Sequence, residues 1–444
     1  MLHLAFDFTR PSPSLPSPLR PDPAAVSAPR PAAVRIARRL GAALIHRDFR
    51  ILWIGAFTST VGTWMQNVAK NWLVLDLTNS SFYLGLDSFL GELPLILFTL
   101  LGGVVADRHS RRLLLSGSQY VQMACAFALA LLVYTGAIDI RHILALSFVA
   151  GTAQAFGGPA YQSLIPALVP KADLPNAVAL NSIQFNLGRI IGPTIAGTTL
   201  AVLGRWLGQT AGTAVCFVLN GLSFLAVITG LRMLRGGDAT PGPRKELWQE
   251  LRGGLRYVRS HPSLLTLTAL ASLGTFLGVP LMTFLPVVAR DVFGRGVDLY
   301  SEMLVVSGAG AVAGALLVAW IGRSARIGRT MLWSQVAFGL AFIGFALSTT
   351  LWVSLVLLFV ASGLLMVGFS LLSSLVQLIA PDEMRGRVMS IYMVAFRGGT
   401  PVGSLVSGYA MSLASAPMVL AIDGALLILV VAWLAWRRQV LRDL

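Results

Sequence analysis

Long apolar stretches separated by short polar turns make up most of this 444-residue chain. Each stretch reaches the length of about 20 mostly apolar residues that a helix needs to cross a bilayer. A longer polar segment, Arg232–His261, divides the stretches into two groups of six. We therefore predict an all-α integral membrane protein with 12 transmembrane helices in two six-helix bundles. The predicted spans are Phe49–Leu75, Phe82–Ala106, Leu113–Gly136, Ile143–Val169, Asn176–Leu203, Gln209–Leu231, Pro262–Ala289, Glu302–Gly322, Thr330–Ser348, Leu351–Ile379, Arg387–Ser412 and Pro417–Trp436.

The predicted organisation has four parts. Residues 1–45 are rich in proline and contain no continuous apolar core, so we expect a disordered cytoplasmic tail there. Residues 46–231 form the N-terminal bundle, residues 232–261 a cytoplasmic linker, and residues 262–444 the C-terminal bundle. Within the linker, Leu247–Val258 places apolar residues on one helical face, which predicts an amphipathic helix lying on the lipid headgroups.

The basic residues predict the orientation of the chain in the membrane. With the N-terminus in the cytoplasm, 27 of the 34 Lys and Arg residues fall in inner segments and four in outer loops. Cytoplasmic loops carry such an excess, so we predict a multi-pass protein of the inner or plasma membrane with both termini in the cytoplasm. The net charge of +15 is spread over many short loops, which favours contact with membrane lipids and argues against nucleic-acid binding.

Composition also bears on the chemistry that the chain can perform. Only 12% of its residues are charged, against about 25% in soluble domains. Its two cysteines, Cys125 and Cys216, lie in apolar runs and predict neither a disulfide framework nor a metal site. Its lysines do not end a phosphate-binding loop, so the chain is not itself an ATP-driven pump. We expect no enzymatic activity, no cofactor and no metal.

Two spans share a local pattern. Span five has Arg189 four residues before Pro193, and span eleven has Arg397 four residues before Pro401, in both cases among glycines. Such a repeat is typical of two homologous bundles related by a pseudo-two-fold axis along the membrane normal, with a substrate site near the midplane between them. Glycine allows a neighbouring helix to approach closely, and proline bends the helix. The helix-five motif comprises Gly188, Gly192, Pro193 and Gly197.

On these motifs the chain resembles the major facilitator superfamily over nearly its whole length, apart from the first 45 or so residues. The turn Gly103–Arg112 resembles the signature loop between helices two and three, with Ser110 where the pattern usually has glycine. Gly188–Gly197 resembles the helix-five motif of drug antiporters. Two more segments, Pro175–Ser182 and Arg385–Met389, resemble the multidrug and siderophore exporter branch that includes macrolide-efflux and enterobactin-export proteins.

The resemblance implies the major facilitator fold and a monomeric secondary transporter. Its expected function is proton-coupled export of amphipathic small molecules, such as drugs or a siderophore, by alternating access. A facilitator of lysophospholipids or other solutes without proton coupling is an alternative. An alternative of another class is a non-transporting membrane receptor or scaffold.

The signature loop is expected to act in gating. In the family fold Asp107 lies near the inner end of helix eleven, where a helix N-terminus attracts anions, and the contact would hold the halves in the outward-open state. A charged loop that only obeys the positive-inside rule is the alternative. The expected latch residues are Gly103, Asp107, Arg108, Arg111 and Arg112.

Six ionisable residues lie inside the predicted spans and away from the span ends, where a lone charge costs several kcal/mol. Glu92 lies about 15 Å from the outer end of its span, near the midplane, and is the best candidate for carrying a proton. A structural ion pair of Glu92 with Arg189 or Arg397 is equally open. The family fold places the twelfth span at the periphery, so a structural or snorkelling role is expected for Asp423. The candidate proton-coupling residues are Glu92, Arg189, Arg397 and Asp87.

A polar set on span one is a candidate for the substrate cavity. It recurs at helical spacings of three and four beside Trp64, and helix one borders the cavity in the superfamily. Solvated side chains near the membrane interface are the alternative. Many proton antiporters of the superfamily carry an arginine in helix four, but Ile143–Val169 contains no basic residue. The candidate cavity residues are Gln66, Asn67, Lys70 and Asn71.

Overall fold

The computed structural model describes residues 41–235, 247–321 and 327–437, and these are helical apart from short turns. In this part of the chain, ten helical segments are long and apolar enough to cross a membrane. The helices that contain them are α3 (Ser81–Arg108), α4 (Arg111–Tyr134), α5 (Ile140–Leu168), α6 (Leu174–Leu207), α7 (Gln209–Met233), the broken segment from α9 to η3 (Pro262–Val292), α12 (Val297–Ile321), α13 (Ile327–Leu347), α14 (Leu351–Ile379) and α16 (Ala416–Arg437).

Two further helices, α2 (Arg47–Thr78) and α15 (Arg385–Leu413), reach membrane length with 32 and 29 residues. They are less apolar because they carry polar side chains such as Gln66 and Arg397. With them, the described residues account for each of the predicted spans. The predicted all-α membrane fold is confirmed.

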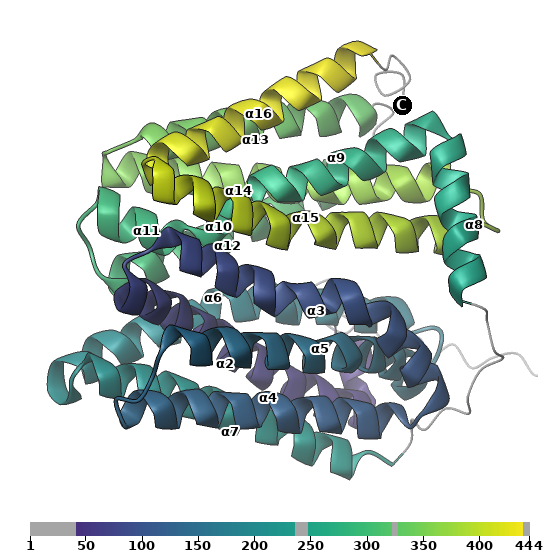
Figure 1. Ribbon diagram of the computed structural model, residues 1–444. Coiled ribbons are helices and arrows are strands. Elements are labelled where there is room, and N and C mark those ends of the chain that lie inside the picture. Colours follow the sequence, from purple (N-terminus) through teal and green to yellow (C-terminus); the bar gives the residue numbers. More distant parts are fainter. Residues whose placement is uncertain (1–40, 236–246, 322–326, 438–444) are drawn as a thin grey trace, which may run out of the picture.

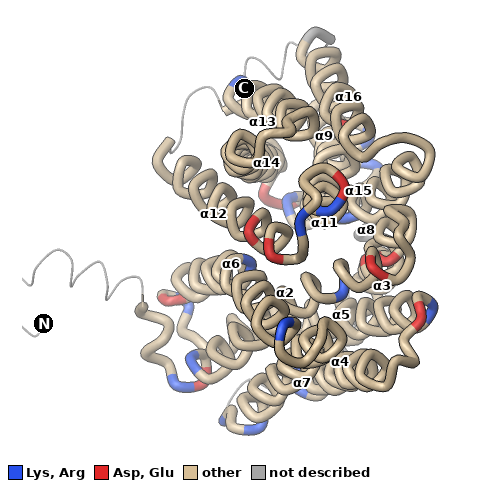
Figure 2. Tube along the Cα trace, turned by 90° about the vertical axis from the view of Figure 1, so that its left-hand side faces the viewer, with Lys and Arg blue, Asp and Glu red and all other residues tan. Residues whose placement is uncertain are grey.

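The helices form two bundles, α2–α7 and α9–α16. Figure 2 looks along the helices, with the α9–α16 bundle in the upper half of the picture and the α2–α7 bundle in the lower half. Within the first bundle α2 packs on α6 and α7, and within the second α14 packs on α12 and α13. The bundles meet mainly where α3 packs on α15 and where α6 packs on α12. We call these contacts the α3–α15 seam and the α6–α12 seam.

The repeat found in the sequence corresponds to the same packing in both bundles. In α6, a Cβ at Gly192 would lie 2.5 Å from the Cβ of Trp64 on α2, the first helix of its bundle. In α15, Gly399 and Gly403 lie against α9, and a Cβ at Gly403 would collide with the carbonyl oxygen of Phe276. Each glycine face therefore brings the fifth helix of a bundle into backbone contact with the first.

The first span of the second bundle is broken, which the sequence analysis did not predict. It consists of α9 (Pro262–Gly278), α10 (Pro280–Thr283), α11 (Leu285–Val287) and the π-helical η3 (Val288–Val292). Proline at the start of α10 and within α11 removes backbone donors. Irregular backbone at membrane depth is tolerated where protein or a cavity surrounds it.

Two short elements lie outside the bundles. In the 3₁₀ turn η2 (Ala42–Ile45), the backbone N–H of Ala43 donates to Asn176 Oδ1 at 2.8 Å, so packing begins within the last residues of the predicted tail. The helix α8 (Leu247–Ser260) confirms the helix predicted in the linker. It crosses one end of the second bundle (Figure 1), where a Cβ at Gly254 would lie 2.9 Å from the carbonyl oxygen of Arg387.

Candidate functional site

The two bundles touch at the predicted outer end and diverge toward the predicted inner end (Figure 1). At the outer end Gly85 of α3 lies against the carbonyl oxygen of Ser404 in α15, and Asn71 Nδ2 donates to the hydroxyl of Tyr300 at 3.1 Å. At the inner end a Cβ at Gly103 would meet no atom within 4 Å. This conformation is closed on the predicted outer side.

A cavity of about 520 Å³ lies between the bundles. Its wall combines apolar side chains, among them Phe224, Leu304 and Phe369, with charged and amide groups near mid-membrane. Such a mixture suits a small molecule with both apolar and polar parts. Seven residues singled out in the sequence line it, namely Gln66, Asn67, Lys70, Asn71, Asp87, Glu92 and Arg189.

Lys70, Asp87 and Ser147 form a closed network on the N-terminal side of the cavity. Lys70 Nζ lies 2.7 Å from Asp87 Oδ2 and donates to Ser147 Oγ at 2.9 Å, while Ser147 Oγ donates to Asp87 Oδ1 at 2.5 Å. The side chains of Lys70 and Asp87 are 15% and 2% exposed. The network joins α2, α3 and α5, so both carboxylate oxygens of Asp87 are engaged.

Lys70 and Asp87 were predicted from the sequence as separate site residues and not as a pair, and Ser147 was not predicted. Serine in an apolar span is common and usually bonds to its own helix backbone, so its type gives no signal. Asn220 was missed for a similar reason; its Nδ2 donates to Gln66 Oε1 at 2.8 Å. These contacts depend on how the helices are turned toward one another.

Glu92 lies on α3, about one and a half helical turns from Asp87 toward the predicted inner end. Its side chain is half-buried, lines the cavity and forms no hydrogen bond or ion pair with the described residues. The positive charges that act on it belong to Arg397 in the opposite bundle and to Lys70. The ion pair considered for Glu92 with Arg189 or Arg397 is therefore not formed in this conformation of the described chain. Arg397 is exposed.

Arg189 crosses the α6–α12 seam. Its Nη2 donates to Ser307 Oγ at 2.9 Å and to the sulfur of Met282 at 3.3 Å, and its Cζ lies 5.9 Å from the ring centre of Trp64. Ser307 also accepts from Ser362 Oγ at 3.0 Å. The guanidinium thus links the bundles through neutral groups.

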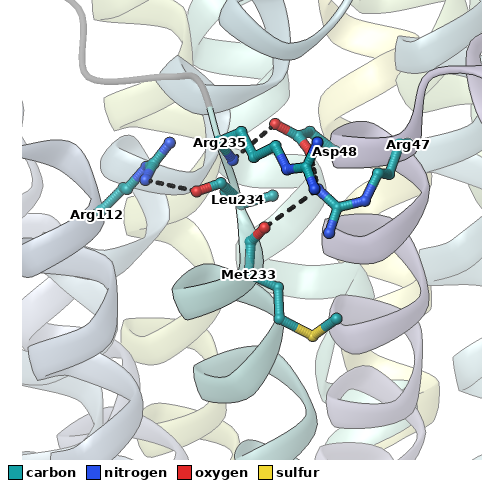
Figure 3. A network of polar contacts seen from close by, with 6 residues as sticks. All are labelled: Arg47, Asp48, Arg112, Met233, Leu234 and Arg235. Atoms are coloured by element: carbon teal, nitrogen blue, oxygen red, sulfur yellow. Dashed lines mark hydrogen bonds and ion pairs between the residues drawn. The ribbon is translucent and has the colours of Figure 1, made fainter.

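The arginines of the signature loop bind backbone within their own bundle. Arg112 Nη1 donates to the carbonyl oxygen of Leu234 at 3.1 Å, just after α7, and Arg111 Nη1 donates to that of Ser163 near the end of α5 at 3.0 Å. Arg47 donates to the carbonyl oxygen of Met233 at 3.3 Å, from the opposite side of this chain segment to Arg112 (Figure 3). Cations at helix C-termini satisfy free carbonyl groups and complement the helix dipole.

The loop therefore stabilises helix ends of the N-terminal bundle in this conformation. The side chains of Asp107 and Arg108 lie outside the described part of the molecule, and the expected latch with helix eleven stays a prediction. Asp423 is buried, and its Oδ2 accepts from Ser407 Oγ on α15 at 2.9 Å, so it faces protein rather than lipid.

Comparison with known proteins supports the resemblance seen in the sequence. The pattern of the transmembrane secretion effector family matches residues 41–442. The staphyloferrin A transporter of Staphylococcus aureus is 26% identical over 79% of this chain and 86% of its own length. The multidrug efflux pump Tap of Mycolicibacterium fortuitum is 28% identical over 81% of this chain and 88% of its own length. The enterobactin exporter of Escherichia coli is 26% identical over 89% of this chain and 94% of its own length.

Among solved structures, a bacterial homologue of the lysosomal transporter Spinster, in an inward-facing and occupied conformation, superimposes with a TM-score of 0.69. It covers 88% of this chain and 96% of its own length at 15% identity, so the likeness shows the fold alone. Fold and family agree with the motifs found in the sequence. The chain belongs to the transmembrane secretion effector family of the major facilitator superfamily, and it is a secondary transporter and not an enzyme.

Proposed function

We propose that the protein exports amphipathic small molecules by alternating access and takes energy from the proton gradient. The observation that carries this proposal is the cavity between the bundles, in which Glu92 and the Lys70–Asp87 pair lie beside apolar side chains. Relatives named for siderophore and multidrug export support the direction and the substrate class. We place both termini in the cytoplasm of a monomer surrounded by membrane lipids.

Glu92 is the group that we assign to proton coupling. Both oxygens of Asp87 are already engaged, whereas Glu92 faces the cavity without a hydrogen bond to the described residues. One of the cations acting on Glu92, Lys70, belongs to its own bundle, and the other, Arg397, belongs to the opposite bundle. Movement of the bundles changes the distance to Arg397, and with it the preference of Glu92 for its charged form. This links proton exchange to opening and closing.

The proposal is tested in everted membrane vesicles with an acidic lumen, using two fluorescent probes. These are the anionic dye carboxyfluorescein and the cationic dye tetramethylrhodamine methyl ester. We expect one of them to accumulate in the vesicles, and the accumulation to collapse when an ionophore removes the pH gradient. Glu92→Gln should lose the accumulation and keep downhill equilibration, whereas the control Glu302→Gln, at an exposed position, should behave as the wild type.

Other outcomes separate the alternatives. Transport that ignores the pH gradient indicates a facilitator, and absence of transport of both dyes by well-folded protein would count against the proposed substrate class. Gradient-driven accumulation by Glu92→Gln would place the coupling group elsewhere. Loss of folding in this variant, with Glu302→Gln intact, would assign Glu92 a structural role.

A further inference from the structure

Arg189 is a charged group of the cavity that the proton-coupling scheme does not use. It lines the cavity, and it forms no ion pair with an acidic side chain of the described residues. Its Nη2 is held by Ser307 and Met282, which are neutral. A guanidinium at membrane depth with only neutral partners is unfavourable by several kcal/mol, so an anion that reaches it is strongly stabilised.

The donors of Arg189 are only partly satisfied. Its Nε is buried and has no hydrogen-bond partner. Its Nη1 also makes no hydrogen bond within the described residues, but this atom is not fully buried. Ser307, fixed by Ser362, holds one side of the guanidinium and leaves the Nη1 edge free. The group is thus pre-positioned to donate to an oxyanion from the cavity.

The acidic side chains of the cavity do not supply that anion. Asp87 is held by Lys70 and Ser147. Glu92 is acted on by Lys70 and Arg397, and Arg189 is not among the charges acting on it. Both carboxylates that line the cavity thus lie near other cations, and Arg189 has no acidic partner among the described residues.

An aromatic ring lies next to this free cation. Trp64 stands 5.9 Å from the guanidinium carbon and also lines the cavity, and Phe185 meets its ring edge-on. Since the indole lines the cavity, it offers an aromatic contact to a planar apolar group adjoining the anion. We propose that Arg189 and Trp64 form the substrate-binding subsite for an organic anion whose carboxylate or other oxyanion adjoins an aromatic or planar apolar group. This inference rests on the proposed export function and specifies its substrate class.

Binding of the two xanthene dyes to purified protein in nanodiscs, without any gradient, tests the inference. Wild-type protein should bind carboxyfluorescein at least tenfold more tightly than tetramethylrhodamine methyl ester in fluorescence anisotropy. Arg189→Gln should weaken carboxyfluorescein binding at least tenfold, and Arg189→Lys less, because lysine keeps the charge and loses the planar donor array. The control Arg205→Gln removes an exposed charge from the same helix and should change neither affinity.

Unchanged carboxyfluorescein affinity in Arg189→Gln, or a wild-type preference for the cationic dye, overturns the inference. Equal loss of both dyes in Arg189→Gln also overturns it, since that result indicates a damaged cavity. If Arg189→Gln does not fold, Ser307→Ala takes its place, because it removes the hydroxyl that holds the guanidinium. This variant should weaken the binding of carboxyfluorescein and leave the binding of tetramethylrhodamine methyl ester unchanged. An unchanged carboxyfluorescein affinity in Ser307→Ala counts against the subsite. Selective binding without gradient-driven transport would overturn the proposed export function and leave this subsite standing.

Discussion

The Lys70–Asp87 pair allows a quantitative test, because it is both charged and buried. At 2.7 Å and an effective dielectric constant of 20, the Coulomb attraction is about 6 kcal/mol. The cost of taking both charges out of water offsets most of that attraction. Removing one partner leaves the other buried and uncompensated, which typically costs about 3–5 kcal/mol. We therefore expect Asp87→Asn to lower the free energy of unfolding by about 3–5 kcal/mol.

Thermal unfolding read with a thiol-reactive dye measures this effect. Cys216 is fully buried and does not line the cavity, so the dye reaches its thiol when the first bundle unfolds. The exposed pair of Arg290 and Asp291 supplies the control, because Asp291→Asn should cost less than about 1 kcal/mol. The double variant Lys70→Met with Asp87→Leu carries no unpaired charge and should recover most of the stability.

Two results would refute this reasoning. One is an Asp87→Asn protein that melts with the wild type and the Asp291→Asn control. The other is a double variant as unstable as the single one, which would mean that the hydrogen bonds with Ser147, rather than the charge balance, stabilise the site. Gradient-driven transport by a stable double variant would show that the pair serves folding and not coupling.

Three further predictions concern the seams and the signature loop. Gly85→Ala should prevent closure of the outer end, because the added Cβ would collide with the carbonyl oxygen of Ser404. Distances between spin labels on the outer ends of the two bundles should therefore lengthen. The control Gly117→Ala, with open space around the added Cβ, should leave these distances unchanged. Arg112→Gln should lose about 1 kcal/mol of stability in thermal melts, because the carbonyl oxygen of Leu234 at the end of α7 loses its donor. Arg141→Gln, at an exposed position, is the control. Equal melting temperatures of the two variants would contradict the capping role. Asp107→Asn should slow transport if the latch operates, and a normal transport rate would exclude it.

The membrane spans could be predicted from the sequence because length and hydropathy are local properties. The span predicted at Leu113–Gly136 corresponds to α4, Arg111–Tyr134, within two residues at each end. The break in the first span of the second bundle could not be predicted in the same way. Proline occurs there at Pro280, but α6 continues through Pro193 without interruption. Whether proline breaks a helix depends on the partners that neighbouring helices offer to the freed backbone groups.

The residues of the candidate site could also be predicted from the sequence, but their contact partners could not. Polar residues in apolar stretches are visible in the sequence, and Lys70, Asp87, Glu92 and Arg189 do lie around one cavity. Their partners could not be predicted, because they lie far along the chain. Ser307 is 118 residues from Arg189, and which residues meet is set by the rotation and tilt of each helix.

The distribution of strong and weak contacts indicates which parts of the molecule can move. The contacts that close the outer end include backbone approaches at small residues, such as Gly85 with Ser404, and a neutral hydrogen bond between Asn71 and Tyr300. One charged group takes part, since Arg290 Nη1 donates to the carbonyl oxygen of Leu75 at 3.2 Å. A neutral hydrogen bond contributes about 1 kcal/mol net, and smooth surfaces of small residues part without interlocked side chains. The buried ion pair of Lys70 lies wholly within the first bundle, so rocking of the bundles leaves it intact. Opening of the outer end therefore breaks hydrogen bonds and small-residue contacts between the bundles and preserves the buried ion pair inside the first bundle.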